Sequence, residues 1–398
     1  MRPNTLSAGE LFEARVARLL QAEGAFARRR INLETQYGEK FKTITDIDVL
    51  AFEFRPDLSA RLTAVECKTT EARSQPATGD RLLWLAGVRR LVRADRAILA
   101  SGRRVEPHQR TLAGELGCEV LDATDIERRE VTQRLAADGQ FGAHDPLLLA
   151  EEHEVFAAIK DLPELKRLYW FSRAELWLSP PIPALKRAFG ALRHLSGRWS
   201  TALPNEEKRS VEWLARNISV GAVLALVRVA GVAYGMGEEA FSLYLRERLA
   251  EGVASYQAMT EISRQVDKYV VAVMAKAGAS PSVSASAMGA FAPEPPSYAD
   301  PLLEVVIRLA GSPHAASRLP ILADFAMAST YGVPVIDERR DPEAARLLRL
   351  VTAFLEGQVR LPPQLTEFLR TESGNGLRPP PQTGLFDQQL DAPTPEGK

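Results

Sequence analysis

Two short apolar segments near the N-terminus carry charged residues within them, and this feature constrains the fold most strongly. The first segment, Thr45 to Phe54, reads TDIDVLAFEF, and the second, Arg61 to Lys68, reads RLTAVECK. Their length and their β-branched and aromatic residues are typical of strands, with a Pro-Asp turn between them. A charge inside an apolar strand is unfavourable unless it is paired or binds a metal ion. The two segments therefore predict a strand pair that holds a polar site.

Side-chain alternation indicates which of these charges face each other. Residues two apart in a strand point to the same face of a sheet. Glu66 and Lys68 should therefore project together. Asp46 and Asp48 should do the same on the neighbouring strand. A divalent cation held by carboxylates can neutralise a phosphodiester and activate water, and a nearby lysine can stabilise the developing charge. The pattern favours such a hydrolytic site over ordinary surface charges.

The flanking sequence predicts the other elements of an α/β domain. Residues Ser7 to Gln21 repeat apolar positions at helical spacing, with Ser7 and Glu10 placed as a capping box and Gly24 after the end. The remaining predicted elements are strands at 25–36, 97–100 and 118–121 and helices at 80–93 and 107–116. This order describes a mixed sheet flanked by helices.

Three segments resemble, in order, the motifs of the PD-(D/E)XK nuclease superfamily. They are Ser7–Glu13 (SAGELFE), Thr45–Leu50 (TDIDVL) and Ala64–Thr69 (AVECKT), and they are closest to the restriction-endonuclease-like and Holliday-junction-resolvase-like branches. The resemblance implies that residues 1–135 form a restriction-endonuclease-like domain. It also implies a metal-dependent DNA endonuclease of bacterial defence, restriction or repair. The alternatives are an RNase on the same fold and a nuclease-derived scaffold without activity.

The resemblance also implies roles for individual residues. Asp48 and Glu66 would ligate Mg²⁺ or Mn²⁺, together with the backbone carbonyl of Cys67. Lys68 would activate or position the attacking water molecule. Glu13 matches the glutamate of the opening helix that supports the metal site in relatives.

Asp46 is a rival to Asp48 for the ligand role. We favour Asp48 because the apolar run follows it immediately, although the proline in the superfamily's name is absent before it. The side chain of Cys67 should point to the opposite face of its strand, where a small thiol packs well.

Basic residues near the predicted strands are candidates for contacts with nucleic-acid phosphates. The chain as a whole has 50 basic and 51 acidic residues, so binding of nucleic acid would need a local patch. A solvated face is the alternative reading of such a run. The candidates are Arg28, Arg29, Arg30, Lys40 and Lys42.

After about residue 145 the sequence predicts only helices. Its divisions are a helical domain at 145–276, a flexible linker at 277–300, a helical segment at 301–371 and a disordered tail at 372–398. The predicted helices of the first part cover 147–159, 164–178, 184–195, 206–215, 221–234, 238–249 and 256–275. The helices could read substrate, form a homo-oligomer or dock a partner. The sequence has no G-x-x-x-x-G-K-[ST] motif, so an ATPase would be a separate partner.

One apolar run, Ile218 to Met236, is long enough to raise the question of a membrane span. Arg228 lies at its middle, which favours a buried core helix and no membrane. The chain has two cysteines, and Met1 to Asn4 lack the apolar core of a secretory signal. These features predict a cytoplasmic protein.

The tail contains Gln382-Thr383-Gly384-Leu385-Phe386 in an otherwise polar, proline-rich stretch. This segment resembles the Q-x-x-L-F type of peptide that docks on the bacterial sliding clamp. Leu385 and Phe386 would fill an apolar pocket and Gln382 would add a hydrogen bond, although Thr383 departs from the commoner leucine. The sliding clamp is therefore a candidate partner.

Overall fold

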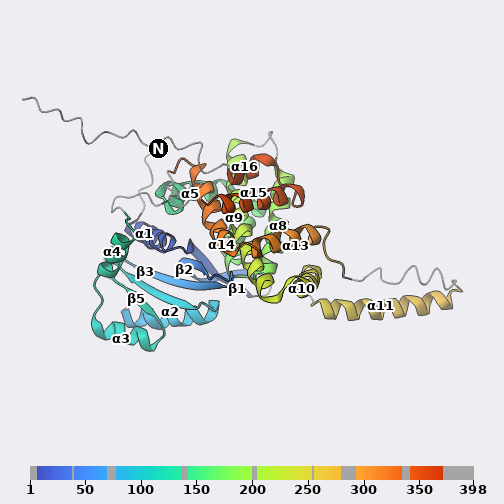
Figure 1. Ribbon diagram of the computed structural model, residues 1–398, viewed down its shortest axis with the longest axis horizontal. Coiled ribbons are helices and arrows are strands. Elements are labelled where there is room, and N and C mark those ends of the chain that lie inside the picture. The colour runs from blue at the N-terminus through green and yellow to red at the C-terminus, as the bar shows by residue number, and fades with distance from the viewer. Residues whose placement is uncertain are drawn as a thin grey trace, which may run out of the picture.

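The computed structural model describes residues 7–37, 40–69, 78–135, 142–199, 204–252, 255–278, 293–333 and 341–370. Its N-terminal part contains a five-stranded sheet, and the part that follows is helical (Figure 1). The predicted α/β domain followed by an all-helical region is therefore confirmed. The strands lie side by side in chain order. They are β1 (Phe26–Tyr37), β2 (Lys40–Phe54), β3 (Ala60–Lys68), β4 (Arg96–Ser101) and β5 (Glu119–Leu121).

The sheet is mixed. β1, β2 and β3 pair antiparallel, whereas β3, β4 and β5 pair parallel. A turn at Pro56 and Asp57 joins β2 to β3, and the Asp57 carboxylate accepts hydrogen bonds from the backbone N–H and hydroxyl of Ser59. The hairpin register pairs Val49 with Val65. Because a slip of one residue would turn every side chain to the other face, this register decides which residues reach the site.

Helices cover both faces of the sheet. α1 (Ala8–Ala22) and α4 (Ala123–Thr132) pack on one face, and α2 (Thr78–Val92) and α3 (Pro107–Glu115) pack on the other (Figure 1). The predicted capping box begins α1: the Ser7 hydroxyl accepts a hydrogen bond from the backbone N–H of Glu10 at 3.2 Å, and the Glu10 carboxylate accepts one from the Ser7 N–H at 2.8 Å. The box orients the turn of α1 that precedes Glu13.

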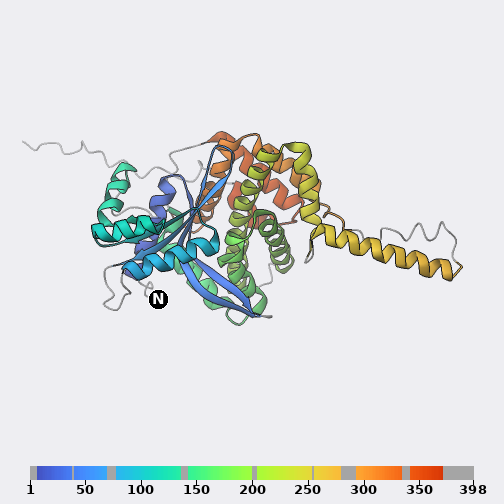
Figure 2. The same ribbon diagram turned by 90° about the horizontal axis from the view of Figure 1, so that it is seen from below.

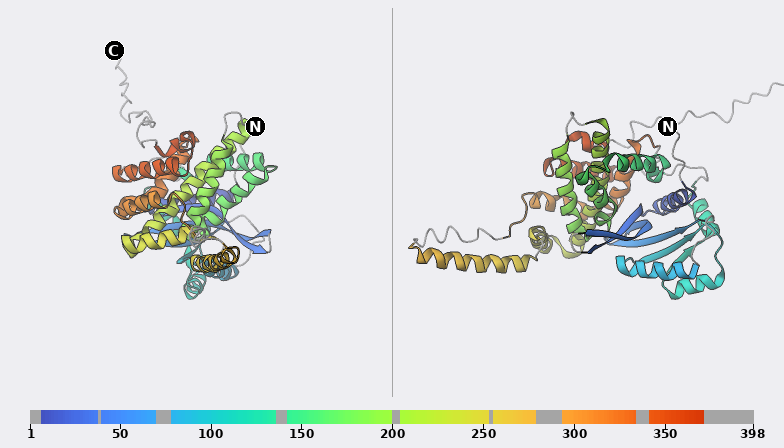
Figure 3. Two further views of the ribbon diagram at one scale, coloured as in Figure 1. Left: turned by 90° about the vertical axis from the view of Figure 1, so that its right-hand side faces the viewer. Right: turned by 180° about the vertical axis from the view of Figure 1, so that it is seen from behind.

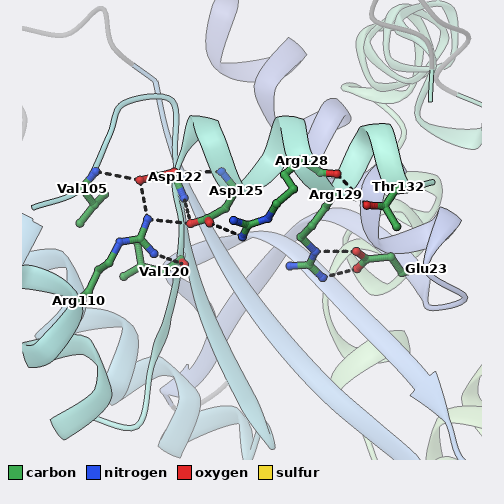
Figure 4. Close-up of polar contacts among 9 residues, drawn as sticks. All are labelled: Glu23, Val105, Arg110, Val120, Asp122, Asp125, Arg128, Arg129 and Thr132. Atoms are coloured by element: carbon green, nitrogen blue, oxygen red, sulfur yellow. Dashed lines mark hydrogen bonds and ion pairs between the residues drawn. The ribbon is translucent and has the colours of Figure 1, made fainter. Parts of the chain in front are cut away.

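A cluster of charged side chains holds α4 in place (Figure 4). The Asp122 carboxylate accepts hydrogen bonds from the backbone N–H of Val105 at 3.3 Å and from the N–H three residues further on at 3.1 Å. It also pairs with Arg110 of α3. Arg129 of α4 pairs with Glu23 at the end of α1. The sequence did not predict α4, and these ionic contacts explain how so polar a helix is fixed.

Replacement of Asp122 is expected to destabilise the fold in a pH-dependent way. Burial alone would raise the pKa of Asp122, but backbone hydrogen bonds and Arg110 lower it overall. Such a carboxylate stabilises the fold above its unfolded pKa of about 4 and loses this contribution as the pH falls. Asp122→Ala should lower the free energy of unfolding by about 1 to 2 kcal/mol at pH 7 and by less at pH 3. Urea unfolding of both proteins at each pH measures this, and an undiminished difference at pH 3 would contradict it.

The helical region surrounds one long central helix, α9 (Asn205–Met236) (Figure 3). It unites two helices that the sequence predicted separately, at 206–215 and 221–234. The polar Asn217 and Ser219 interrupt the apolar pattern there, yet both are buried inside the bundle. The other helices are α5 (Pro146–Ile159), α6 (Pro163–Arg173), α7 (Glu175–Leu178), α8 (Pro181–Arg198), α10 (Glu238–Ala250), α11 (Tyr256–Lys276), α13 (Ala299–Ala310), α14 (Pro313–Ser329), α15 (Pro342–Gly357) and α16 (Pro363–Arg370), with the short 3₁₀ helix η1 (Gly142–His144) before α5.

Among the described helices, α9 alone is long and apolar enough to cross a membrane. Most of its apolar stretch is buried against other helices of the bundle. The guanidinium of Arg228 donates a hydrogen bond to the carbonyl oxygen of Ser179 at 3.2 Å and lies 5.4 Å from the centre of the Phe52 ring. The central charge that argued against a membrane span is thus accommodated between helix and sheet, as in a core helix.

Part of the sheet shares a hydrophobic cluster with the helical region, whereas two further clusters lie between the sheet and its own helices. Phe26, Leu50 and Phe52 of the sheet belong to the same cluster of buried side chains as α9 and α15. α13 and α14 pack directly on α9, so the helical segment predicted at 301–371 completes the bundle begun at 145–276. This shared cluster joins the described parts of the sheet and of the helical region, and the domain boundary expected near residue 135 stays a prediction. The predicted linker at 277–300 lies partly outside the described residues.

Gly231 of α9 marks the closest approach of helix and sheet. A Cβ atom added there would lie 2.5 Å from the carbonyl oxygen of Leu58, in the turn between β2 and β3. Because this obstacle is backbone, Gly231→Ala is expected to lower the free energy of unfolding by about 1 to 3 kcal/mol. Gly235→Ala is the matched control, since a Cβ there meets nothing within 4 Å and alanine is the better helix former. Equal unfolding midpoints for the two variants would argue against this contact.

α11 projects away from the rest of the molecule (Figures 1 and 2). Within this helix Ser263 alone is buried, and Ile262, Tyr269 and Val273 are large apolar side chains that are exposed.

Candidate active site

The strand pair places Asp48 and Glu66 next to each other. Asp48 lies one residue before Val49 in β2, and Glu66 lies one residue after its partner Val65 in β3. The carboxylate of Asp48 accepts a hydrogen bond from the backbone N–H of Cys67 at 2.6 Å. The sheet therefore brings together two of the predicted ligands.

Lys68 and Glu66 share one face, as strand alternation predicted. The Lys68 Nζ atom lies 2.6 Å from Glu66 Oε1. Arg81 of α2 approaches the same oxygen, with its Nη1 atom at 3.3 Å. Glu66 is 4% exposed, so these two cations compensate a buried carboxylate. The Cys67 side chain packs on the opposite face, in the cluster that contains Val65. Its predicted packing role is confirmed.

Glu13 reaches the edge of the site from α1. Its carboxylate accepts a hydrogen bond from Arg30 Nε at 3.0 Å, and Arg30 also pairs with Glu10 at 2.9 Å. Burial raises the pKa of Glu13, although Arg30 opposes the change. The charge of Glu13 also raises the pKa of Asp48, which lies on β2. The opening-helix glutamate thus contributes to the negative potential of the site.

The surroundings of Asp48 disfavour its charged form. Burial raises the pKa of Asp48 to about 8, and the charge of Glu66 acts in the same direction. The hydrogen bond from Cys67 and the charge of Lys68 oppose this shift without cancelling it. A buried carboxyl whose ionisation is disfavoured in this way is the kind of oxygen donor that a bound divalent cation stabilises in its charged form.

The side chains fit a site with two carboxylate ligands. Within the described ranges, no three Asp, Glu, His or Cys side chains gather closely enough to hold a metal ion by themselves. A cation at this position would therefore depend on Asp48 and Glu66 together with oxygen from the backbone or water. The backbone carbonyl of Cys67 is the candidate from the sequence.

The remaining acidic and lysine candidates lie farther from this pair. Asp46 is exposed on β2, whereas Asp48 is partly buried, and this difference favours Asp48 as the ligand. Lys40 and Lys42 belong to β2 rather than to the predicted loop. Lys42 pairs with Thr35 of β1 and its side chain is exposed.

The three adjacent arginines do not form an open basic surface. Arg28 pairs with Asp324 of α14 at 3.0 Å and lies over the Trp177 ring, 5.0 Å from its centre. Arg29 donates a hydrogen bond to the backbone carbonyl of Glu10 at 3.3 Å. Arg30 holds the acids of α1. The helical region encloses the run, and its contact with nucleic acid stays a prediction.

Arg81 is the functional candidate that sequence reasoning missed. The sequence feature that could have identified Arg81 is its position in the first turn of the helix that follows the Glu-x-Lys strand. The tail candidates Gln382, Leu385 and Phe386 lie outside the described residues, as does the whole segment predicted to be disordered.

Comparisons with known proteins give no family: no family model, no curated protein and no solved structure matches this chain.

Proposed function

We propose that the protein is a metal-dependent nuclease that hydrolyses phosphodiester bonds of DNA, with a restriction-endonuclease-like N-terminal domain. The observation that carries the proposal is the placement of Asp48, Glu66 and Lys68 around one point of a mixed sheet. Adjacent strands supply the two carboxylates, and the ammonium group lies 2.6 Å from one of them. A protein that served only as a binding scaffold would not need charged residues within apolar strands, where burial of a charge is unfavourable.

Each residue has a distinct part in this proposal. Asp48, Glu66 and the Cys67 carbonyl would hold Mg²⁺ or Mn²⁺. When bound, such a cation neutralises charge on the phosphate and activates water. Lys68, fixed by its pair with Glu66, would orient the attacking water molecule and stabilise charge that develops on the phosphate oxygens. Arg81 would position Glu66 by holding the same carboxylate oxygen.

The setting of the proposed activity rests on the sequence resemblance. The resemblance suggests a role in bacterial defence, restriction or repair in the cytoplasm. A separate ATPase and the sliding clamp are the candidate partners. Among the candidates whose side chains the structure describes, Lys42 is exposed and would contact a phosphate.

Substrate trials with purified protein test the proposal. Supercoiled plasmid, linear DNA and RNA would each be incubated with Mg²⁺, Mn²⁺ or EDTA, and Mn²⁺ binding would be followed by calorimetry. Cleavage of DNA that EDTA abolishes is the expected result. Cleavage of RNA alone would change the substrate class and keep the chemistry. Absence of both cleavage and metal binding would overturn the proposal in favour of a scaffold.

A further inference from the structure

A cavity of about 60 Å³ lies where β1 meets the helical region. Its walls come from β1, η1, α5, α6, α7, α9 and α14, so residues far apart in the chain build it together. This volume is enough for a few water molecules or for one small polyatomic ion. The cavity is separate from the carboxylate pair, although Arg30 lines it and also holds Glu13.

The charges that line the cavity do not balance. Arginines outnumber acids, and two of the arginines are neutralised within the cavity: Arg28 pairs with Asp324 at 3.0 Å, and Arg173 pairs with Glu152. A third arginine is neutralised by the acids of α1. Arg29 has no carboxylate within ion-pair distance among the residues that the structure describes. Burial lowers the pKa of Arg29 to about 10; the charges of Glu13 and Glu152 oppose this shift, and those of Arg30 and Arg173 add to it.

Several polar atoms of the lining lack a hydrogen-bond partner in the described part of the chain. His144 Nε2, Arg28 Nε and Arg173 Nε are buried donors or possible donors, and Asp324 Oδ2 is a buried acceptor. Donors are therefore in excess. The pKa of His144 is lowered well below its usual value by burial and then by the charges of Arg29 and Arg28. The cavity lining thus holds more buried donor atoms than acceptor atoms without a hydrogen-bond partner in the described part of the chain.

We propose that this cavity binds a phosphate-class oxoanion, with Arg29, Arg173 and His144 as its ligands. Water molecules could complete the hydrogen bonds, but they would leave Arg29 without a direct ion-pair partner among the described residues. A tetrahedral oxoanion supplies both the negative charge and several acceptor oxygens, and guanidinium groups match its geometry. The group is either a free anion or the phosphate monoester of a larger molecule. This inference does not depend on the proposed nuclease activity.

Thermal unfolding of the full chain in EDTA tests the site. Inorganic phosphate, compared with chloride at equal ionic strength, is expected to raise the Tm of the wild-type protein by about 3 °C or more. Arg29→Gln should abolish this rise. In chloride alone Arg29→Gln should be at least as stable as wild type, because it removes an unpaired charge. Arg308→Gln is the matched control: it removes an exposed arginine on α13 and should keep the full phosphate effect.

His144→Leu gives a second test that leaves every arginine in place. It removes the unpartnered Nε2 atom and should weaken the phosphate effect without loss of stability in chloride. A phosphate effect in both Arg29→Gln and His144→Leu that is as large as in the wild type, or no effect in the wild type with any phosphate probe, would overturn the proposal.

Two further probes assign the source of the anion. Adenosine monophosphate represents a free small molecule, and a 5′-phosphorylated oligonucleotide, compared with its unphosphorylated form, represents a nucleic-acid end. Stabilisation by inorganic phosphate and the mononucleotide supports the first source. Stabilisation by the phosphorylated oligonucleotide alone supports the second. Because no divalent metal is present, failure here leaves the proposed cleavage chemistry untouched.

Discussion

Asp48→Asn is expected to abolish metal-dependent cleavage while making the metal-free protein more stable. Loss of a ligand carboxylate should reduce the cleavage rate by at least about a hundredfold. Asparagine still offers an oxygen to the backbone N–H of Cys67, and it removes the free-energy cost of burying an ionisable carboxyl beside Glu66, a cost that the raised pKa of Asp48 reflects. The free energy of unfolding in EDTA should therefore rise by about 1 to 2 kcal/mol. Plasmid cleavage rates and urea unfolding measure the two effects.

Variants of the neighbouring residues provide the controls. Glu66→Gln and Lys68→Ala should also lose cleavage, because each removes a group from the same site. Glu53→Gln changes an exposed glutamate on β2, the strand that carries Asp48, and should be active. Full activity in any of the three site variants would refute the assignment. A severe Asp46→Asn combined with a mild Asp48→Asn would exchange the two aspartates.

The isolated fragment 1–135 is expected not to fold cooperatively, although the sequence indicated a self-contained domain there. Removal of the helices would expose Phe26, Leu50 and Phe52, which are at most 2% exposed in the full chain. Each large apolar side chain contributes about 1.5 to 3 kcal/mol to stability when buried. Exposure of several would therefore remove most of the free energy of unfolding of a typical protein, which is about 5 to 15 kcal/mol. Near-ultraviolet circular dichroism and urea unfolding of the fragment measure this. A sharp, single unfolding transition would show that the sheet stands alone.

Local patterns in the sequence were sufficient to predict most of the sheet and the positions of the candidate site residues on it. Strand alternation placed Glu66 and Lys68 on one face, and the capping box placed the start of α1. The choice between Asp46 and Asp48 also followed from the adjacent apolar run, and the greater burial of Asp48 agrees with it. The placement of Glu66 and Lys68 on one face and the start of α1 are confirmed because each depends on residues close together in the chain, whereas the ligand role of Asp48 stays a prediction.

Features that depend on distant residues could not be predicted in this way. Arg28 pairs with Asp324, and no local pattern links two residues so far apart. α4 is polar, with Ile126 as its buried apolar side chain, so its periodicity was too weak to recognise. α9 was divided in two because Asn217 is polar, although the finished bundle buries it. The arginine run therefore looked like a surface in the sequence and became part of an interior in the fold.

The common core of sheet and helices changes how loss of activity should be interpreted. Substitutions in α9 or α15 that create cavities would loosen the strands that hold Asp48 and Glu66, because the same cluster of side chains supports both. In a mutational scan, inactive variants would then spread across the whole helical region without marking any contact with substrate. Measuring the abundance of folded protein beside activity separates the two causes, and positions that lose activity at full abundance identify the chemistry.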